Sequence, residues 1–244
     1  MNLGITLATS RRILAQLRHD HRTLGLLTGV PALLMVLLRY VLDQPMLFDR
    51  IGPMLLGLFP FVVMFVVTSV ATLRERTGGT LERLMTMPLA QLDLLLGYAL
   101  AFGLVALVQV GVVLAISLTL LDLDLAGPLG SLILLAVLTA LLGMALGLFA
   151  SAFARTEFQA VQFMPAFVLP QFLLCGLLIP RDDMASWLQA VADVLPLTYA
   201  VEGMQEISTR TDVTSTLTTD IIVITGFTVV SLLLGAVTLR RKTH

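Results

Sequence analysis

Charge and cysteine are scarce in this sequence, and each shortage excludes a class of function. Charged residues make up 13% of the 244 positions and hydrophobic residues 57%, which is far from the composition of a soluble domain. The net charge is −1 and the chain offers no basic face, so nucleic acid is not an expected partner. The single cysteine, Cys175, lies in an apolar run, which excludes a disulfide framework and a cysteine-based metal site.

The groups needed for catalysis are also missing. The only lysine is Lys242, which follows Arg241, so no glycine-rich loop ends in Lys-Ser/Thr and ATP must be bound elsewhere. The three histidines, His19, His21 and His244, flank the apolar part of the chain, which excludes a Ser-His dyad or a histidine metal site within a bilayer. We therefore expect no enzyme activity and no cofactor in this chain.

Long apolar runs dominate what is present. Each is about long enough to cross the ~30 Å hydrocarbon core of a membrane as a helix, and too continuously apolar for a barrel strand. The sequence therefore predicts an all-α polytopic membrane protein with a region at residues 1–23 and a six-span region at residues 24–244. The predicted spans cover residues 24–42, 51–73, 92–121, 129–153, 163–179 and 221–239.

Residues 1–23 precede the first span and show a helical pattern. Apolar residues at 13, 14 and 17 share one face, and the other faces carry arginines. This is typical of an amphipathic helix lying on a membrane surface, with a frayed basic tail as the alternative. Between spans five and six, residues 180–220 predict short external helices, one closed by Pro196 and a second through Tyr199 to Ile207.

Small residues recur three or four positions apart in the fourth predicted span. Gly143 and Gly147 are at the centre of this stripe, which also contains Ala136, Ala140 and Ser151. Such a stripe lets another helix approach closely. It predicts helix packing and carries no functional information by itself.

The distribution of positive charge predicts the orientation. Six spans place both termini on one side, and eleven of the fifteen Lys and Arg residues fall on that side, against three on the other. By the positive-inside rule, both termini are expected in the cytoplasm and the protein in the cell membrane.

A dense polar segment at residues 74–88, RERTGGTLERLMTMP, interrupts the apolar runs. It cannot lie in hydrocarbon, so it must lie at a membrane surface. Gly78 and Gly79 permit a sharp turn, Thr80 can cap a short helix, and Leu81, Leu84 and Met85 form an apolar face. The segment is either a helix that docks in a groove of a cytoplasmic partner or an ordinary solvated loop.

Two motifs resemble those of ABC exporter permeases of the second type, the group with the drug-resistance and polysaccharide-export permeases. The first matches the coupling pattern E-R-x-x-G-T-L-E-x-L at Glu75, Arg76, Gly79, Thr80, Leu81, Glu82 and Leu84. The second, after the predicted fifth span, matches at Gly176, Pro180, Met184, Trp187, Leu188, Pro196, Leu197, Thr198, Tyr199 and Glu202.

The resemblance implies a permease subunit that forms a homodimer and binds two separate ATPase subunits, which hold the ATP and Mg. It also implies that residues 74–85 form a coupling helix that contacts the ATPase. The implied coupling residues are Arg74, Glu75, Arg76, Gly79, Thr80, Leu81, Glu82, Arg83, Leu84 and Met85.

The resemblance further implies that spans two and five line the substrate path across the dimer axis. These spans, like span one, contain prolines, and bent helices often line cavities. Our candidate lining residues are Phe59, Phe65, Thr68, Ser69, Phe167, Gln171 and Phe172. Such a lining favours a lipophilic or amphipathic cargo, drug or lipid-like. A membrane anchor that recruits a cytoplasmic enzyme, or an integral membrane enzyme, is the alternative function.

Overall fold

The computed structural model describes residues 3–78 and 91–240. Within these residues all regular structure is helical, which confirms the predicted all-α fold. The helices are α1 (Leu3–His19), α2 (His21–Leu42), α3 (Pro45–Thr77), α5 (Gln91–Thr119), α6 (Leu129–Ser151), α7 (Glu157–Leu174), η1 (Arg181–Asp183), α8 (Ser186–Ala192), α9 (Pro196–Thr209) and α10 (Ser215–Arg240).

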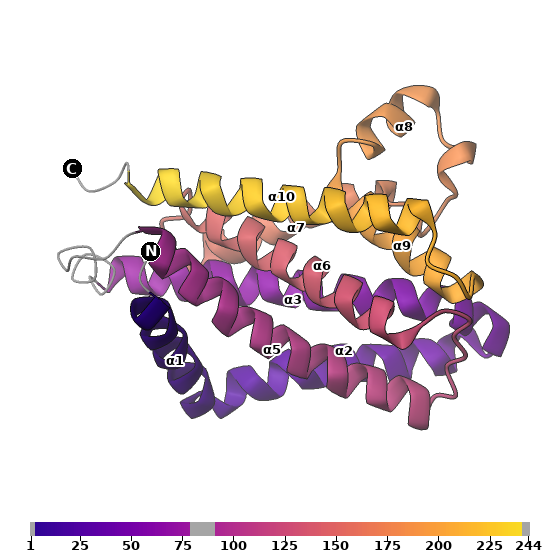
Figure 1. Ribbon diagram of the computed structural model, residues 1–244, viewed down its shortest axis with the longest axis horizontal. Coiled ribbons are helices and arrows are strands. Elements are labelled where there is room, and N and C mark those ends of the chain that lie inside the picture. The colour runs from indigo at the N-terminus through magenta and orange to yellow at the C-terminus, as the bar shows by residue number, and fades with distance from the viewer. Residues whose placement is uncertain (1–2, 79–90, 241–244) are drawn as a thin grey trace.

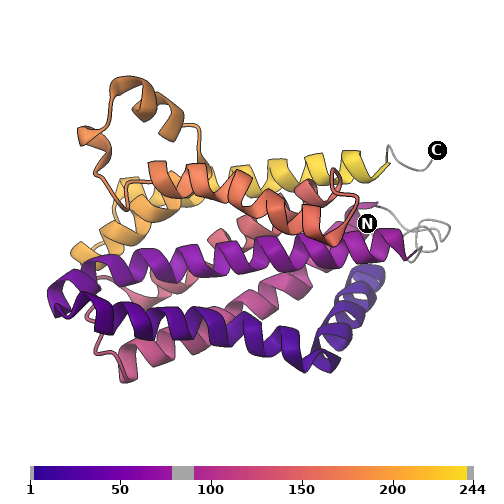
Figure 2. The same ribbon diagram turned by 180° about the vertical axis from the view of Figure 1, so that it is seen from behind.

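The long helices lie roughly side by side along the longest axis of the molecule (Figure 1). Helix α1 crosses one end of this bundle at a steep angle, and α8 projects from the bundle at the other end (Figures 1 and 2). The C-terminal part of α10 reaches the same end as α1. That α1 lies on a membrane surface stays a prediction.

Five of the described helices are long and apolar enough to cross a membrane. They cover Thr23–Leu42, Pro45–Thr77, Asp93–Thr119, Leu129–Ser151 and Ser215–Gly235. Helix α7, at the predicted fifth span, has 18 residues and contains Pro165 and Pro170. It is not among the five, so the count of six spans stays a prediction.

Several helix boundaries differ from the predicted ones, and two of these differences have local reasons. Helix α3 continues through Arg74 and Arg76 to Thr77, so the first charged residues of the polar segment form its last turn and are not part of a loop. Helix α7 begins at Glu157, because the Thr156 side chain accepts a hydrogen bond from the backbone N–H of Gln159 and caps the helix.

The predicted close packing of the small-residue stripe is confirmed. A Cβ atom added to Gly143 would lie 2.2 Å from the backbone oxygen of Phe61, and one added to Gly147 would lie 2.3 Å from that of Phe65. Helix α6 therefore lies directly on the backbone of α3. This contact is the centre of the bundle.

The segment after α7 contains the two predicted short helices, α8 and α9. Helix α9 packs against α3, α6 and α10, and its Leu197, Val201 and Met204 are almost fully buried. In contrast, Trp187 of α8 is 67% exposed. Thus α9 belongs to the core of the bundle, whereas α8 lies outside it.

Candidate functional site

The last turn of α3 is bonded to its neighbours through three consecutive residues. Arg74 forms a bidentate ion pair with Glu157 at the start of α7: its Nε lies 2.7 Å from Oε1 and its Nη2 lies 2.9 Å from Oε2. Both side chains are more than half exposed. The hydrogen bond from Arg74 lowers the pKa of Glu157, so this carboxylate stays ionised at neutral pH.

Glu75 joins α3 to two further helices. Its Oε1 lies 3.1 Å from Nη2 of Arg12 in α1, and its Oε2 accepts a hydrogen bond from the hydroxyl of Tyr98 in α5. The side chain of Glu75 is only 14% exposed and that of Arg12 is 28% exposed. This pair is better shielded from water than the Arg74–Glu157 pair, so it is less screened by salt.

Arg76 caps the end of α6. Its Nη1 donates to the backbone oxygen of Ser151 at 2.8 Å, and its Nη2 donates to that of Ala154. The last carbonyl groups of a helix have no partner within the helix. The guanidinium supplies a further donor to the last carbonyl of α6, at Ser151, and one to Ala154 in the link that follows. It also places a positive charge where the helix dipole is negative.

We call Arg74, Glu75 and Arg76, with Arg12, Tyr98, Glu157 and the backbone carbonyls of Ser151 and Ala154, the α3 clasp. It connects the end of α3 to α1, α5, α6 and α7. The coupling motif identified its three α3 residues from the sequence. It did not identify the partners, which lie between 23 and 83 positions away along the chain.

Replacing Arg76 with glutamine is expected to destabilise the protein more than replacing Arg74 with glutamine. The first change removes charged bonds to two backbone carbonyls, each worth about 1.5–3 kcal/mol, whereas an exposed ion pair is worth about 0–1 kcal/mol. We expect Arg76→Gln to lower the thermal midpoint by about 4 °C or more in detergent. An equal loss in Arg74→Gln would contradict the assigned capping role.

The rest of the predicted coupling segment, residues 79–85, lies outside the described residues. This covers Gly79, Thr80, Leu81, Glu82, Arg83, Leu84 and Met85. Their role stays a prediction. What the structure describes is the helix end that leads into them and the bonds that hold it.

The structure brings together two of the candidate lining residues. The ring centroids of Phe65 in α3 and Phe167 in α7 lie 6.2 Å apart. Thr68 and Ser69 are fully buried within the chain. Gln171 is 5% exposed, and its amide donates to the backbone oxygen of Phe167 and accepts from the backbone N–H of Leu197. Spans two and five are therefore in contact, and a lining role stays a prediction.

The remaining two candidates, Phe59 and Phe172, are partly buried against the main apolar cluster. A polar pocket of about 460 Å³ lies nearby and is lined in part by Arg181, Asp193 and Glu202. Arg181 forms ion pairs with both of these carboxylates, the one with Glu202 at 2.8 Å. Three residues of the second sequence motif, Gly176, Pro180 and Glu202, line this charged pocket.

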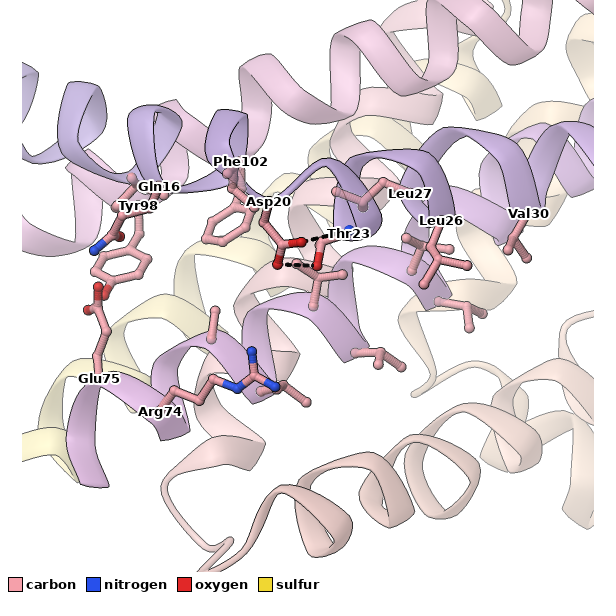
Figure 3. A pocket seen from close by; sticks show the side chains of 18 residues that line it. Gln16, Asp20, Thr23, Leu26, Leu27, Val30, Arg74, Glu75, Tyr98 and Phe102 are labelled. Carbon is pink, nitrogen blue, oxygen red and sulfur yellow. Dashed lines mark hydrogen bonds between the residues drawn. The ribbon is translucent and has the colours of Figure 1, made fainter. Parts of the chain in front are cut away.

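A second pocket lies between α1, α2, α3 and α5, beside the α3 clasp. Its volume is about 580 Å³, and 18 residues line it. We call it the α1–α3 trough. Figure 3 shows the polar side chains, among them Gln16, Asp20 and Glu75, gathered toward one side, with Leu26 and Val30 on the other. Asp20 caps the start of α2, because both of its carboxylate oxygens accept hydrogen bonds from Thr23.

The described residues form a bundle whose long helices are apolar enough to span a membrane, with ion pairs at both of its ends. Residues 4–208 match the family model of the ABC-2 type transporter. The chain belongs to this family.

Several curated proteins are similar to this chain. It is 30% identical over 155 residues to the probable multidrug ABC transporter permease YbhR of Escherichia coli, which covers 64% of this chain and 42% of that protein. It is 28% identical over 148 residues to the linearmycin resistance permease protein LnrN of Bacillus subtilis, covering 60% and 38%. It is 29% identical over 159 residues to ABC transporter G family member 20 of Dictyostelium discoideum, covering 65% and 22%. The chain therefore matches less than half the length of each of these relatives.

Proposed function

We propose that the chain is the permease subunit of an ATP-driven exporter that moves a lipophilic or amphipathic compound out of the cytoplasm or the inner leaflet. The observation that carries this proposal is the α3 clasp. A partner that displaces the segment after Gly78 would pull on one helix end that is bonded to four other helices. Movement imposed at this point would therefore reach most of the bundle.

The partner in this proposal is a separate ATPase subunit that docks on residues 79–85. The positive-inside distribution supports a cytoplasmic position for both termini and for this segment. In this orientation the α3 clasp is at the cytoplasmic surface, where an ATPase can reach it. The ATPase would switch between two conformations, and the coupling segment would transmit this conformational change to α3.

The exposed face of α7 supports assembly as a homodimer with two ATPase subunits. Phe158, Leu169 and Leu173 share one side of α7 and are each more than half exposed within the chain. Phe167 lies on the opposite side, where its ring contacts Phe65. A second copy facing this helix would put α3 and α7 of both copies around a shared path, as the family resemblance implies.

The amphipathic cargo is supported by two kinds of observation. The relatives YbhR and LnrN are named for multidrug transport and for linearmycin resistance. The candidate path residues of α3 and α7 are aromatic or uncharged. A path of this composition suits a molecule with a large apolar part.

Replacing Glu82 or Leu84 with alanine is expected to uncouple ATP hydrolysis from export. Each change removes a contact that the docking segment is predicted to make, while the bundle is untouched. The measurement is substrate export into inverted membrane vesicles, with ATP hydrolysis and membrane level measured in parallel. Asp212→Ala, at the other end of the bundle, is the matched control. Unchanged export in both Glu82→Ala and Leu84→Ala would contradict docking through this segment.

A further inference from the structure

The segment between α7 and α9 stands apart from the bundle. It covers residues 176–195, with η1 and α8, and we call it the α8 flap. In Figures 1 and 2 it projects away from the long helices, and Ala192 is its one buried residue. Trp187 and Val191 of α8 are exposed. The middle of the flap therefore has no buried residue that would pack it onto the bundle.

The flap is closed on itself by its own bonds. Arg181, near its start, forms an ion pair with Asp193, near its end. The side-chain amide of Gln189 in α8 donates a hydrogen bond to the backbone oxygen of Met184 at 2.9 Å. Both bonds join parts of the flap to each other, so residues 181–193 can move as one unit.

One ion pair connects the middle of the flap to the bundle. Nη1 of Arg181 lies 2.8 Å from Oε2 of Glu202 in α9. Among the described residues, no other hydrogen bond or ion pair links residues 181–191 to the bundle. The remaining bonds from α9 reach residues 192–195, at the end of the flap that continues into α9. The contact with Glu202 is therefore the attachment that holds the flap against α9.

The two ends of the flap have backbone that can act as hinges. Gly176 has a φ of 90°, which glycine adopts readily and other residues rarely do, and the residues that follow it form bends and no helix. At the other end, Pro196 begins α9. A proline disfavours the helical conformation in the residue before it, and Leu195 is extended. Helices α8 and α9 are thus separate bodies joined by a flexible link.

The charged pocket lies between the flap and the bundle. Arg181, Asp182 and Gln189 of the flap line it together with Cys175 at the end of α7 and Glu202 of α9. Cys175 is the only cysteine in the chain and is 2% exposed. Movement of the flap away from α9 would open the pocket and expose this thiol.

We propose that the α8 flap is a hinged cover over the charged pocket, and that Arg181 is an ionic latch that holds the cover closed. Breaking the bond to Glu202 lets the flap turn about Gly176 and Leu195 and admits water and solutes to the pocket. The side chains of Arg181 and Glu202 are 32% and 38% exposed. Salt therefore reaches and screens the latch, so the cover can open while the bundle stays folded. The proposal concerns one chain and requires neither transport nor a particular orientation in the membrane.

The native Cys175 provides the test, because its thiol reacts with a maleimide when the pocket opens. The full chain is placed in nanodiscs, and the addition of N-ethylmaleimide, an uncharged reagent, is followed by the mass of the intact protein. We expect slow addition at about 0.1 M NaCl. The rate should rise about threefold at about 1 M NaCl, because the Debye length falls from about 10 Å to about 3 Å.

Variants of the latch test which bond holds the cover. Arg181→Gln and Glu202→Gln are each expected to raise the rate of addition about fivefold and to abolish its dependence on salt. Arg181→Lys keeps the charge and should stay within about twofold of the unchanged protein. The matched control is Arg210→Gln at the end of α9, because Arg210 is exposed and forms no ion pair with the described residues.

Four results would overturn the proposal. Addition to the unchanged protein as fast as to the unfolded protein would show that the flap does not cover Cys175. A rate independent of salt would show that the closure is not ionic. Equal rates in Arg181→Gln, Glu202→Gln and the unchanged protein would show that this pair does not hold the cover, and an equal rise in Arg210→Gln would show a general loosening.

The thermal midpoint of each variant is measured in parallel, so that unfolding is not taken for opening. If Arg181→Gln does not fold, Glu202→Gln and the salt dependence of the unchanged protein decide the result. Because none of these measurements uses ATP or cargo, they are independent of the proposed export function.

Discussion

Replacing Gly147 with alanine is expected to remove most of the folded protein. The added methyl group would lie 2.3 Å from the backbone oxygen of Phe65 and 3.0 Å from its carbonyl carbon. A side chain could rotate away, but a helix backbone cannot, so α6 and α3 must separate. Overpacking a core typically costs about 1–3 kcal/mol, and we expect the upper end of this range or more because the obstacle is backbone.

The measurement is the yield and thermal midpoint of monodisperse protein in mild detergent. Gly143→Ala should behave like Gly147→Ala, since its new methyl group would meet the backbone oxygen of Phe61 at 2.2 Å. Gly226→Ala is the matched control in α10, because a Cβ there meets no atom within 4 Å. Alanine favours a helix over glycine by about 1 kcal/mol, so the control should be as stable as the unchanged protein or more stable. Normal folding of both α6 variants would contradict the observed packing.

Replacing Glu75 with alanine is expected to have the largest effect on coupling. The change leaves Arg12 without its carboxylate and Tyr98 without its acceptor, and so releases α1 and α5 from the end of α3. Hydrogen bonds to charged groups contribute about 1.5–3 kcal/mol. If the α3 clasp transmits movement, export should fall about tenfold or more, whereas the ATPase activity of the partner should persist.

A direct readout is the accessibility of α1. Trypsin cleaves after arginine, and α1 contains Arg11, Arg12 and Arg18. We expect trypsin to cleave α1 faster in Glu75→Ala than in the unchanged protein. We also expect Arg12→Gln to lose export to a similar extent as Glu75→Ala. The matched control is Asp212→Ala, which removes an acidic residue outside the α3 clasp. The exchanged pair Arg12→Glu with Glu75→Arg should restore part of the activity. Unchanged cleavage and export in Glu75→Ala would contradict a role for this pair.

The long helices could be predicted from the sequence because the apolar runs are long enough to span a membrane and because the polar links between them are short. The stripe through Gly143 and Gly147 also predicted a close helix contact. It did not identify the partner helix, since the small side chains show only that some backbone approaches. The structure shows that the partner is α3, which contacts α6 at Phe61 and Phe65.

The polar segments were harder to interpret. The sequence placed residues 180–220 outside the bundle because they are the longest polar stretch, yet α9 buries Leu197, Val201 and Met204 in the core. Helix α9 begins at Pro196 and has one apolar face. Only the tertiary structure shows which helices cover that face. In the candidate site, the motif identified Glu75, but Arg12 and Tyr98 could not be predicted. Both partners are distant in the sequence, and neither occurs in the motif.

The three α3 residues of the clasp are consecutive, and successive side chains of a helix project about 100° apart. Arg74, Glu75 and Arg76 therefore hold the helix from three directions, toward α7, toward α1 with α5, and toward α6. A turn of α3 about its own axis would strain all three attachments together and could not exchange them one at a time. The end of this helix is therefore held against rotation about its own axis.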